Sequence, residues 1–511
     1  MENAIASRLI RQLEQALAEL PPERSPDLRR LESEKNLLQQ FVEQTASLNE
    51  SLLNGQLKLQ LAFWRYSLMA TRNRLQFYGS DSGFSPINDP LNQLADLLAP
   101  AINERAMSES TRANLEAWLA YASAEVRHRH PDYDVADCQA RLDALSQVRN
   151  TAQWLKAYDF SRPFEISLND RTELTEWLDR QVWPAMPEIL ATLKCDAPPQ
   201  KSKSSPAHDS SAAALNSRQY YSHRLVSNLG TQRSAAQLHQ QAVQDLEALE
   251  TSLNSLVRFR YGSLQGSWAE TIRSDPSNYL STPSLSTHQT LNALTAWLEQ
   301  LYQPAHPGSL PALLNLSPAP NQHAEAFRLT QAPAGNTLLL VNTGELSAIP
   351  LFEWAPRITL ALATPVTTHR ASAPFRVGTG LIKMHSKLQD KSLPLPDRLG
   401  ILSVLASQTA LAAADTGVHE LAWTDKQVRS FLTTHTTLSS NAVTQALDTI
   451  HYSPATLAAA YTGFSEMNAV IGDASEAQKK QWFAAAEHYK TYPAALWPDI
   501  YRLSTINSSS D

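Results

Sequence analysis

A chain of 511 residues is long enough for two to four average domains. Its formal net charge of −7 and its dispersed lysines and arginines exclude the basic face that a nucleic-acid-binding protein needs. With only 15 glycines and 18% charged residues, and with alanine and leucine recurring throughout, the composition favours a large, mainly α-helical protein.

The N-terminal residues predict an amphipathic helix. Ile5, Leu9, Ile10, Leu13 and Leu17 share one stripe at helical spacing, and the segment lacks the charged-then-apolar plan of a signal peptide. We therefore expect the first helix of a cytoplasmic protein.

Two cysteines, Cys138 and Cys195, show neither metal-ligand spacing nor a disulfide framework. Ordinary thiols in a reducing compartment are the expectation. The most apolar segment, residues 399–414, is shorter than the ~20 residues that cross a bilayer, so a buried helix and no membrane contact are expected.

Three regions follow from the patterns along the chain. Residues 1–195 give successive amphipathic helices, and residues 196–217 are rich in Ser, Pro and Lys, which predicts a linker or mobile loop. Residues 218–511 form the third region. Within it, Thr231 is the expected N-cap of a long helix through Val257, and residues 287–302 predict another helix.

Two neighbouring segments predict a β-hairpin. Residues 325–331 and 337–343 alternate or run apolar on either side of a short A-P-A-G-N stretch, a pattern typical of paired strands. The apolar segment 348–364 follows and predicts a buried helix.

One ionisable pair, Glu353 and Arg357, interrupts that apolar helix at i,i+4 spacing. A carboxylate in an apolar helix beside a short strand is the layout of a zinc hydrolase, where flanking histidines hold the metal and the glutamate activates its water. No histidine flanks Glu353.

Several separated motifs occur together in residues 218–503. They are the Y-x-x-x-L and L-H segment between Tyr220 and His239, the D-T-G-x-H-x-x-x-W of Asp415, Thr416, Gly417, His419 and Trp423, the Y-x-G of Tyr461 and Gly463, and Tyr492-Pro493. In order and spacing they resemble the domain-of-unknown-function 885 family, helical proteins of zinc-peptidase-like appearance. The resemblance implies a large helical zinc-peptidase-like fold, with the small β-hairpin beside the former active-site helix.

The same resemblance implies that the metal site is degenerate. The family carries H-E-x-x-P-G-H-H where this chain reads F-E-W-A-P-R-I-T, so Phe352, Ile358 and Thr359 stand where histidines belong. Val377 stands where a later acidic ligand is expected. Zinc needs about three protein ligands, so we expect no metal and no cofactor.

Each remaining motif residue has a structural interpretation. Asp415 and Thr416 are expected to hydrogen-bond backbone at a helix end, with Gly417 at positive φ. His419 is expected to be a satisfied interior histidine, with a pocket contact as the alternative. Tyr461 is either a former oxyanion donor or a packed tyrosine whose hydroxyl reaches solvent.

Two further histidines leave an alternative open. His369 and His385 lie near Glu353 in sequence, and a rebuilt metal site with shifted ligands would use them. The structural expectation for Glu353 is an ion pair in which Arg357 supplies the positive charge that zinc once gave.

The function expected is that of a metal-free relative of a zinc-peptidase-like family. It binds a peptide-like or small acidic ligand, or a protein partner, in a residual cleft, without nucleic acid or membrane. The alternatives are an active hydrolase with an unrecognised site and a scaffold with a filled cleft, so enzyme activity stays open with the non-catalytic interpretation favoured. The residual pocket candidates are Glu353, Arg357, Asp415, His419, Trp423 and Tyr461.

Overall fold

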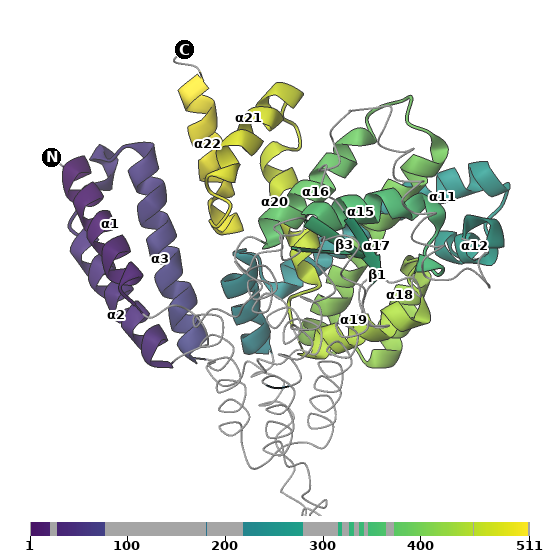
Figure 1. Cartoon of the computed structure of the whole chain (residues 1–511), viewed down its shortest axis with the longest axis horizontal. Coiled ribbons are helices and arrows are strands. Elements are labelled where there is room, and N and C mark those ends of the chain that lie inside the picture. The colour runs from purple at the N-terminus through teal and green to yellow at the C-terminus, as the bar shows by residue number, and fades with distance from the viewer. Residues whose placement is uncertain are drawn as a thin grey trace, which may run out of the picture. The chain divides into compact units, whose positions relative to one another are not determined.

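The protein is mainly α-helical, as the composition predicted (Figure 1). The computed structural model describes residues 2–20, 28–76, 180, 218–279, 315–318, 327–331, 337–341, 346–363, 373–452 and 454–508. The chain folds into two compact units, each made of separated segments. Unit 1 is Met1–Asp81, Asp209–Asp275 and Phe352–Asp511, and unit 2 is Ser82–His208 and Pro276–Leu351.

The candidate site residues all lie in unit 1, which holds most of the described helices. Its N-terminal helices are α1 (Glu2–Ala18), α2 (Leu28–Thr45), the short turn η1 (Glu50–Leu52) and α3 (Gly55–Gln76). Its middle segment contains the single turn η3 (Leu225–Leu229), α11 (Ala235–Tyr261) and α12 (Trp268–Ser274). Its last segment contains α15 (Trp354–Ala363), α16 (Ala373–Lys387), α17 (Leu395–Leu421), α18 (Asp425–His435), α19 (Ser440–Tyr452), α20 (Ala458–Ile471), α21 (Glu476–Glu487), η7 (Ala494–Leu496) and α22 (Trp497–Ser508), preceded by η5 (Leu351–Glu353).

Helix α17 is the central element of unit 1. Helix α11 packs along it, and α15, α16, α18, α19 and α20 also contact it. Among the described residues α17 is the one helix long and apolar enough to suit a bilayer, yet 89% of its most apolar window is buried inside the protein. This burial confirms the prediction of a buried helix for residues 399–414. Its many alanines leave room for neighbouring helices on several sides.

Glycines set the closest helix approach in unit 1. A Cβ atom at Gly378 of α16 would overlap the backbone of Gly463 in α20, and a Cβ at Gly463 would overlap the carbonyl of Pro374. Because neither glycine carries a side chain, α16 and α20 pack backbone against backbone. Gly463 belongs to the Y-x-G motif, and packing explains the need for glycine at both positions here.

The N-terminal helices join the C-terminal part of unit 1 through α3. Ala6, Ile10 and Leu13 of α1 are buried against α2 and α3, which confirms most of the predicted N-terminal stripe. The Phe63 ring of α3 stacks on Tyr492 at 4.3 Å between ring centroids.

This packing corrects the predicted regions 1–195, 196–217 and 218–511. Residues 1–81 belong with the C-terminal helices, and residues 276–351 belong to the other unit. Composition shows where a chain is polar but not which distant segments pack together, so the discontinuous division was not visible in the sequence. The stretch 196–217 and the predicted helix 287–302 lie outside the described residues.

Helix α11 begins three residues later than predicted. Ser234 is its N-cap and forms a capping box with Gln237, in which each side chain accepts from the other residue's backbone N–H. The predicted cap, Thr231, instead donates its hydroxyl to Glu466 of α20. Thr231 and Ser234 both have a hydroxyl suited to an N-cap. Ser234 takes that role because Gln237, three residues later, completes the capping box.

The described part of unit 2 contains three short strands and one 3₁₀ turn, η4 (Pro276–Asn278). The strands are β1 (Asn315–Pro318), β2 (Phe327–Gln331) and β3 (Thr337–Val341). Strand β3 lies in the middle, antiparallel to β2 with Leu329 opposite Leu339, and parallel to β1 with Leu316 opposite Leu339.

Candidate functional site

Glu353 ends the turn η5 and is fully buried. Ser403 of α17 donates its hydroxyl to one carboxylate oxygen, and Thr437 donates to the same oxygen at 2.6 Å. Arg357, one turn further along α15, donates Nε and Nη2 to the other oxygen at 2.9 and 2.7 Å. The predicted Glu353–Arg357 pair is thereby confirmed.

These four hydrogen bonds occupy the acceptor positions of the Glu353 carboxylate, which offers about four lone-pair sites. The carboxylate therefore has no acceptor left for a cation or a water. A buried ion pair of this kind contributes little net stability, yet removing one partner is costly because the other charge stays buried. The geometry is that of a structural element in the core.

The positions that resemble lost metal ligands have ordinary packing roles. Ile358 is buried in the core, and Thr359 donates its hydroxyl to the Ala355 carbonyl of its own helix at 2.8 Å. Val377 packs against the main core, and the Phe352 ring lies under the Arg260 guanidinium at 5.9 Å.

No group of three His, Cys, Asp or Glu side chains that could hold a metal ion occurs within the described residues. His385 of α16 packs edge-on against the Phe464 ring at 5.6 Å, and burial lowers its pKa. His369 lies outside the described part of the chain. The position of His385 therefore does not support a rebuilt metal site.

The D-T-G-x-H motif lies within the last two turns of α17, and Gly417 does not have the predicted positive φ. The left-handed residue is Ala422, with φ of 55°, immediately after the helix. Gly417 is needed for a different reason, because a Cβ atom there would overlap the Trp423 indole that folds back on the helix.

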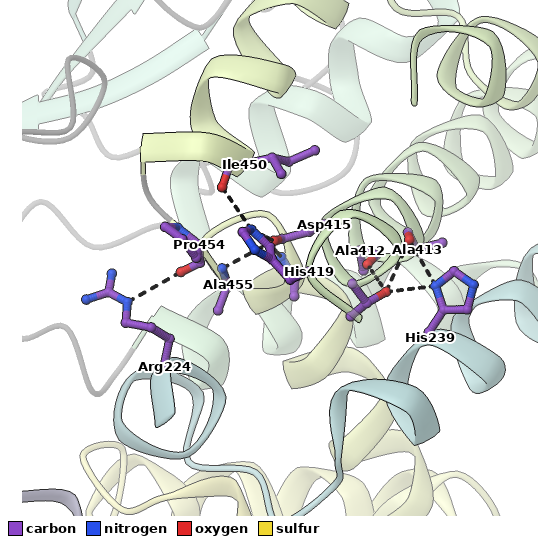
Figure 2. Close-up of polar contacts among 11 residues, drawn as sticks. Arg224, His239, Ala412, Ala413, Asp415, His419, Ile450, Pro454 and Ala455 are labelled. Carbon is purple, nitrogen blue, oxygen red and sulfur yellow. Dashed lines mark hydrogen bonds and ion pairs between the residues drawn. The ribbon is translucent and has the colours of Figure 1, made fainter. Parts of the chain in front are cut away.

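Asp415 does hydrogen-bond the backbone at a helix end, but the end belongs to another helix (Figure 2). Its carboxylate is fully buried and accepts from the backbone N–H of Ala455 at 3.3 Å and of Ala458 at 3.1 Å, at the start of α20. Burial raises the pKa of Asp415 to about 7, although the backbone N–H donors act in the opposite direction. The carboxylate thus caps α20 from α17.

His419 lies one turn beyond Asp415 and contacts the end of α19. Its Nε2 is 3.0 Å from the Ile450 carbonyl oxygen, an atom that only accepts, so Nε2 carries the proton. The imidazole also stacks on the Tyr221 ring at 4.5 Å, and burial lowers the pKa of His419 to about 4. The prediction of a satisfied interior histidine is confirmed.

The Tyr221 ring is buried, stacks on His419 and interacts with the Asp415 carboxylate. Burial, followed by the neighbouring Asp415 carboxylate, raises the pKa of Tyr221 well above its ordinary value. Its hydroxyl and the Asp415 carboxyl are therefore both driven toward their neutral forms.

On the other side of α17, His239 of α11 places Nδ1 at 3.0 Å from both the Ala413 carbonyl and the Thr416 hydroxyl (Figure 2). Its ring lies edge-on to Trp423, with centroids 5.3 Å apart. The sequence does not indicate this contact between the motif ending at His239 and the D-T-G motif, because His239 and Thr416 are 177 positions apart.

Tyr461 of α20 donates its hydroxyl to Asp245 of α11 at 2.6 Å, and Gln241 donates to the other oxygen of Asp245 at 2.8 Å. The expectation that this hydroxyl reaches solvent is therefore wrong. Asp245 was missed because an aspartate on a helix face with regular spacing is most often solvated.

The pocket candidates thus do not form one constellation. Ser403, which holds Glu353, and Asp415 are twelve positions apart in one helix, a separation of about 18 Å at the helical rise. Glu353 and Arg357 lie at one position, Asp415 and His419 at a second, and Tyr461 hydrogen-bonds Asp245 on a different helix.

The chain matches no protein-family model and no curated protein. Two solved structures share its fold over almost their whole length. One, from Colwellia psychrerythraea, is described as a "putative lipoprotein" and aligns 100% of this chain with 99% of that chain at 12% identity and a TM-score of 0.62. The other, from Shewanella oneidensis, is described as a "putative lipoprotein of unknown function" and aligns 99% of this chain with 100% of that chain at 11% identity and a TM-score of 0.53.

At such identities the likeness shows the fold alone. The description of both neighbours as lipoproteins contradicts the cytoplasmic location predicted from the sequence, and we withdraw that prediction. It rested on an amphipathic first helix, which proteins of any compartment share. The resemblance to the domain-of-unknown-function 885 family stays a prediction.

Proposed function

We propose that this chain is a non-catalytic relative of the zinc-peptidase-like family it resembles, and that it acts by binding a peptide-like or small acidic ligand or a protein partner. Because both fold neighbours are described as lipoproteins, the proposal also places this chain outside the cytoplasm. The observation that carries it is the complete hydrogen bonding of Glu353 by Arg357, Ser403 and Thr437.

A general base must reach the proton that it removes, directly or through one water. Glu353 has no solvent exposure, and each of its oxygens already accepts two hydrogen bonds. Arg357 also places a positive charge beside the carboxylate, where a metal ion would otherwise supply one. The arrangement supports a carboxylate that holds α15 on α17 and does not take part in turnover.

An active hydrolase with an unrecognised site is the rival function. It predicts that Glu353→Gln abolishes turnover while the protein stays folded, whereas our proposal predicts a loss of stability with no activity to lose. Glu353→Gln therefore distinguishes the two functions: it lowers turnover if the protein is a hydrolase and lowers stability if the protein is non-catalytic.

The experiment combines metal analysis with a cleavage assay. Protein purified without added metal is analysed for zinc, and a peptide library is incubated with wild type and with Glu353→Gln, with and without chelator. We expect no stoichiometric zinc, no chelator-sensitive cleavage and a lower unfolding midpoint for the variant. Glu270→Gln, at an exposed position of α12, is the matched control. Stoichiometric zinc, or cleavage that Glu353→Gln removes, would contradict the proposal.

A further inference from the structure

Glu353, Asp415 and His419 share one neighbour, the segment around helix α19. We define the α19 segment as residues 437–452 together with 454–458, which connects α18 to α20. Its first end contacts Glu353, and its second end contacts Asp415 and His419. The two contact points lie far apart along α17 but are linked through this one segment.

The first end contacts Glu353, and the residues just before it contact α12. Thr437 donates its hydroxyl to Glu353 at 2.6 Å, so the segment supplies one of the four hydrogen bonds to that carboxylate. Just before it, Arg273 of α12 donates to the carbonyl oxygens of Thr436 and of Thr433, the latter at 2.7 Å.

The second end is held on both of its sides (Figure 2). His419 donates to the Ile450 carbonyl oxygen in the last turn of α19, and Asp415 accepts from the amides of Ala455 and Ala458. Figure 2 shows these side chains reaching from α17 toward the same connection.

Backbone geometry at this connection is strained and depends on those contacts. Ala455 has φ of 69°, a conformation that costs a non-glycine residue about 1 kcal/mol or more. Arg224 adds a hydrogen bond from Nε to the Pro454 carbonyl oxygen at 3.4 Å. A strained backbone persists only where its surroundings fix it, and here the fixing groups come from α17 and from the helical turn before η3.

Between its ends, the α19 segment packs mainly through buried side chains. Val443, Leu447 and Ile450 are buried in an apolar cluster with α11, α17 and α18, whereas Asn441 and His451 are exposed. Polar contacts to other elements lie at the two ends, and one more lies between them, where Arg429 of α18 donates to the Thr444 hydroxyl at 2.9 Å.

We propose that the α19 segment opens and closes as one unit, with Glu353 holding one end and Asp415 with His419 holding the other. In the closed state Thr437 occupies an acceptor position of Glu353, and opening would free that position. The proposal concerns conformation and does not require the protein to be catalytic or non-catalytic.

The test is amide hydrogen exchange of the full chain, because the Ala455 and Ala458 amides are themselves donors to Asp415. Thr437→Val removes the hydroxyl at the first end and keeps the shape of the side chain. If the segment opens as one unit, the exchange of the Ala455 and Ala458 amides rises about tenfold or more, although these lie at the opposite end. The amides of residues 401–406 in α17 are expected to stay unchanged.

Thr434→Val is the matched control, because Thr434 lies in α18 just before the segment and its hydroxyl donates to the Ser430 carbonyl of the same helix. It is expected to leave exchange at Ala455 and Ala458 unchanged. The reciprocal variant, Asp415→Asn, is expected to speed exchange at the Val443 amide, near the first end.

The proposal is overturned if Thr437→Val speeds exchange only at residues close to position 437. It is equally overturned if exchange rises uniformly through α17, since that would be global unfolding, or if nothing changes at Ala455 and Ala458. The Thr437→Val result alone decides, whether or not the Asp415→Asn protein folds.

Discussion

The backbone of Phe352 lies against Gly400, so closely that a Cβ atom at position 400 would overlap the Phe352 carbonyl oxygen. Gly400 precedes Ser403 by one turn of α17, and the Ser403 hydroxyl donates to Glu353. Because direct backbone contact fixes η5 on α17, this glycine sets the position from which Ser403 reaches the carboxylate. The hydrogen bonding of Glu353 thus depends on a residue without a side chain.

Gly400→Ala is expected to lower the free energy of unfolding by about 1–3 kcal/mol, because the added methyl group must push η5 away from α17. Urea denaturation followed by circular dichroism measures the change. Gly55→Ala is the control, since a methyl group there meets only side-chain atoms of Leu503 and no backbone. Equal stabilities of the two variants would show that the Phe352 backbone moves to accommodate the methyl group, which would contradict the prediction.

Arg357→Met is expected to destabilise the protein by about 3–5 kcal/mol, because the Glu353 carboxylate stays buried without its cation. The double variant Glu353→Gln with Arg357→Met is expected to recover part of that loss. Denaturant unfolding of the wild type, both single variants and the double variant gives the coupling free energy. Additive effects would mean that the two charges do not depend on each other.

Tyr461→Phe tests the hydrogen bond between the Tyr461 hydroxyl and Asp245. Its ring is buried and keeps its packing, so the loss is that of one hydrogen bond to a charged acceptor, about 1.5–3 kcal/mol. Combined with Asp245→Asn in a double-mutant cycle, the two changes are expected to be less than additive. An oxyanion role would instead leave stability unchanged and lower turnover.

The helical character of the chain and the Glu353–Arg357 pair were predictable because both depend on short-range spacing. The i,i+4 spacing placed the two side chains on one face, and the structure joins them at 2.7 Å. The buried nature of α17 was likewise visible in its apolar composition.

Contacts between distant segments were not predictable from one sequence. Nothing in the spacing shows that Thr437 reaches Glu353 or that Asp415 caps α20, since these contacts join residues 84 and 43 positions apart. The motif residues were therefore placed in one pocket, because the family has one there. The discontinuous units were missed for the same reason: long-range packing creates them.

Asp415 and His419 are expected to have opposite effects on the pH dependence of stability. Burial raises the pKa of Asp415 from 3.8 to about 7, so the folded state binds this proton more tightly than the unfolded state. Its stabilising contribution is complete below about pH 4 and is lost as pH rises to about 7. Burial lowers the pKa of His419 from 6.5 to about 4, so its contribution is complete above pH 6.5 and is lost as pH falls toward 4.

The two variants separate these effects. The stability advantage of wild type over Asp415→Asn is expected to shrink by about 3 kcal/mol between pH 4 and pH 7. The advantage over His419→Gln is expected to grow by about 3 kcal/mol between pH 4 and pH 6.5. Urea midpoints at half-unit pH steps measure both, with Asp473→Asn at an exposed position as the control.

In the wild type the two slopes oppose each other between about pH 4 and pH 6.5, so this pair adds little net pH dependence there. At the connection between α19 and α20, the stabilising contribution of His419 falls as pH decreases, and that of Asp415 falls as pH increases. Slopes of the same sign in the two variants would contradict this compensation. A steep wild-type profile that neither variant alters would place the titrating groups elsewhere in the chain.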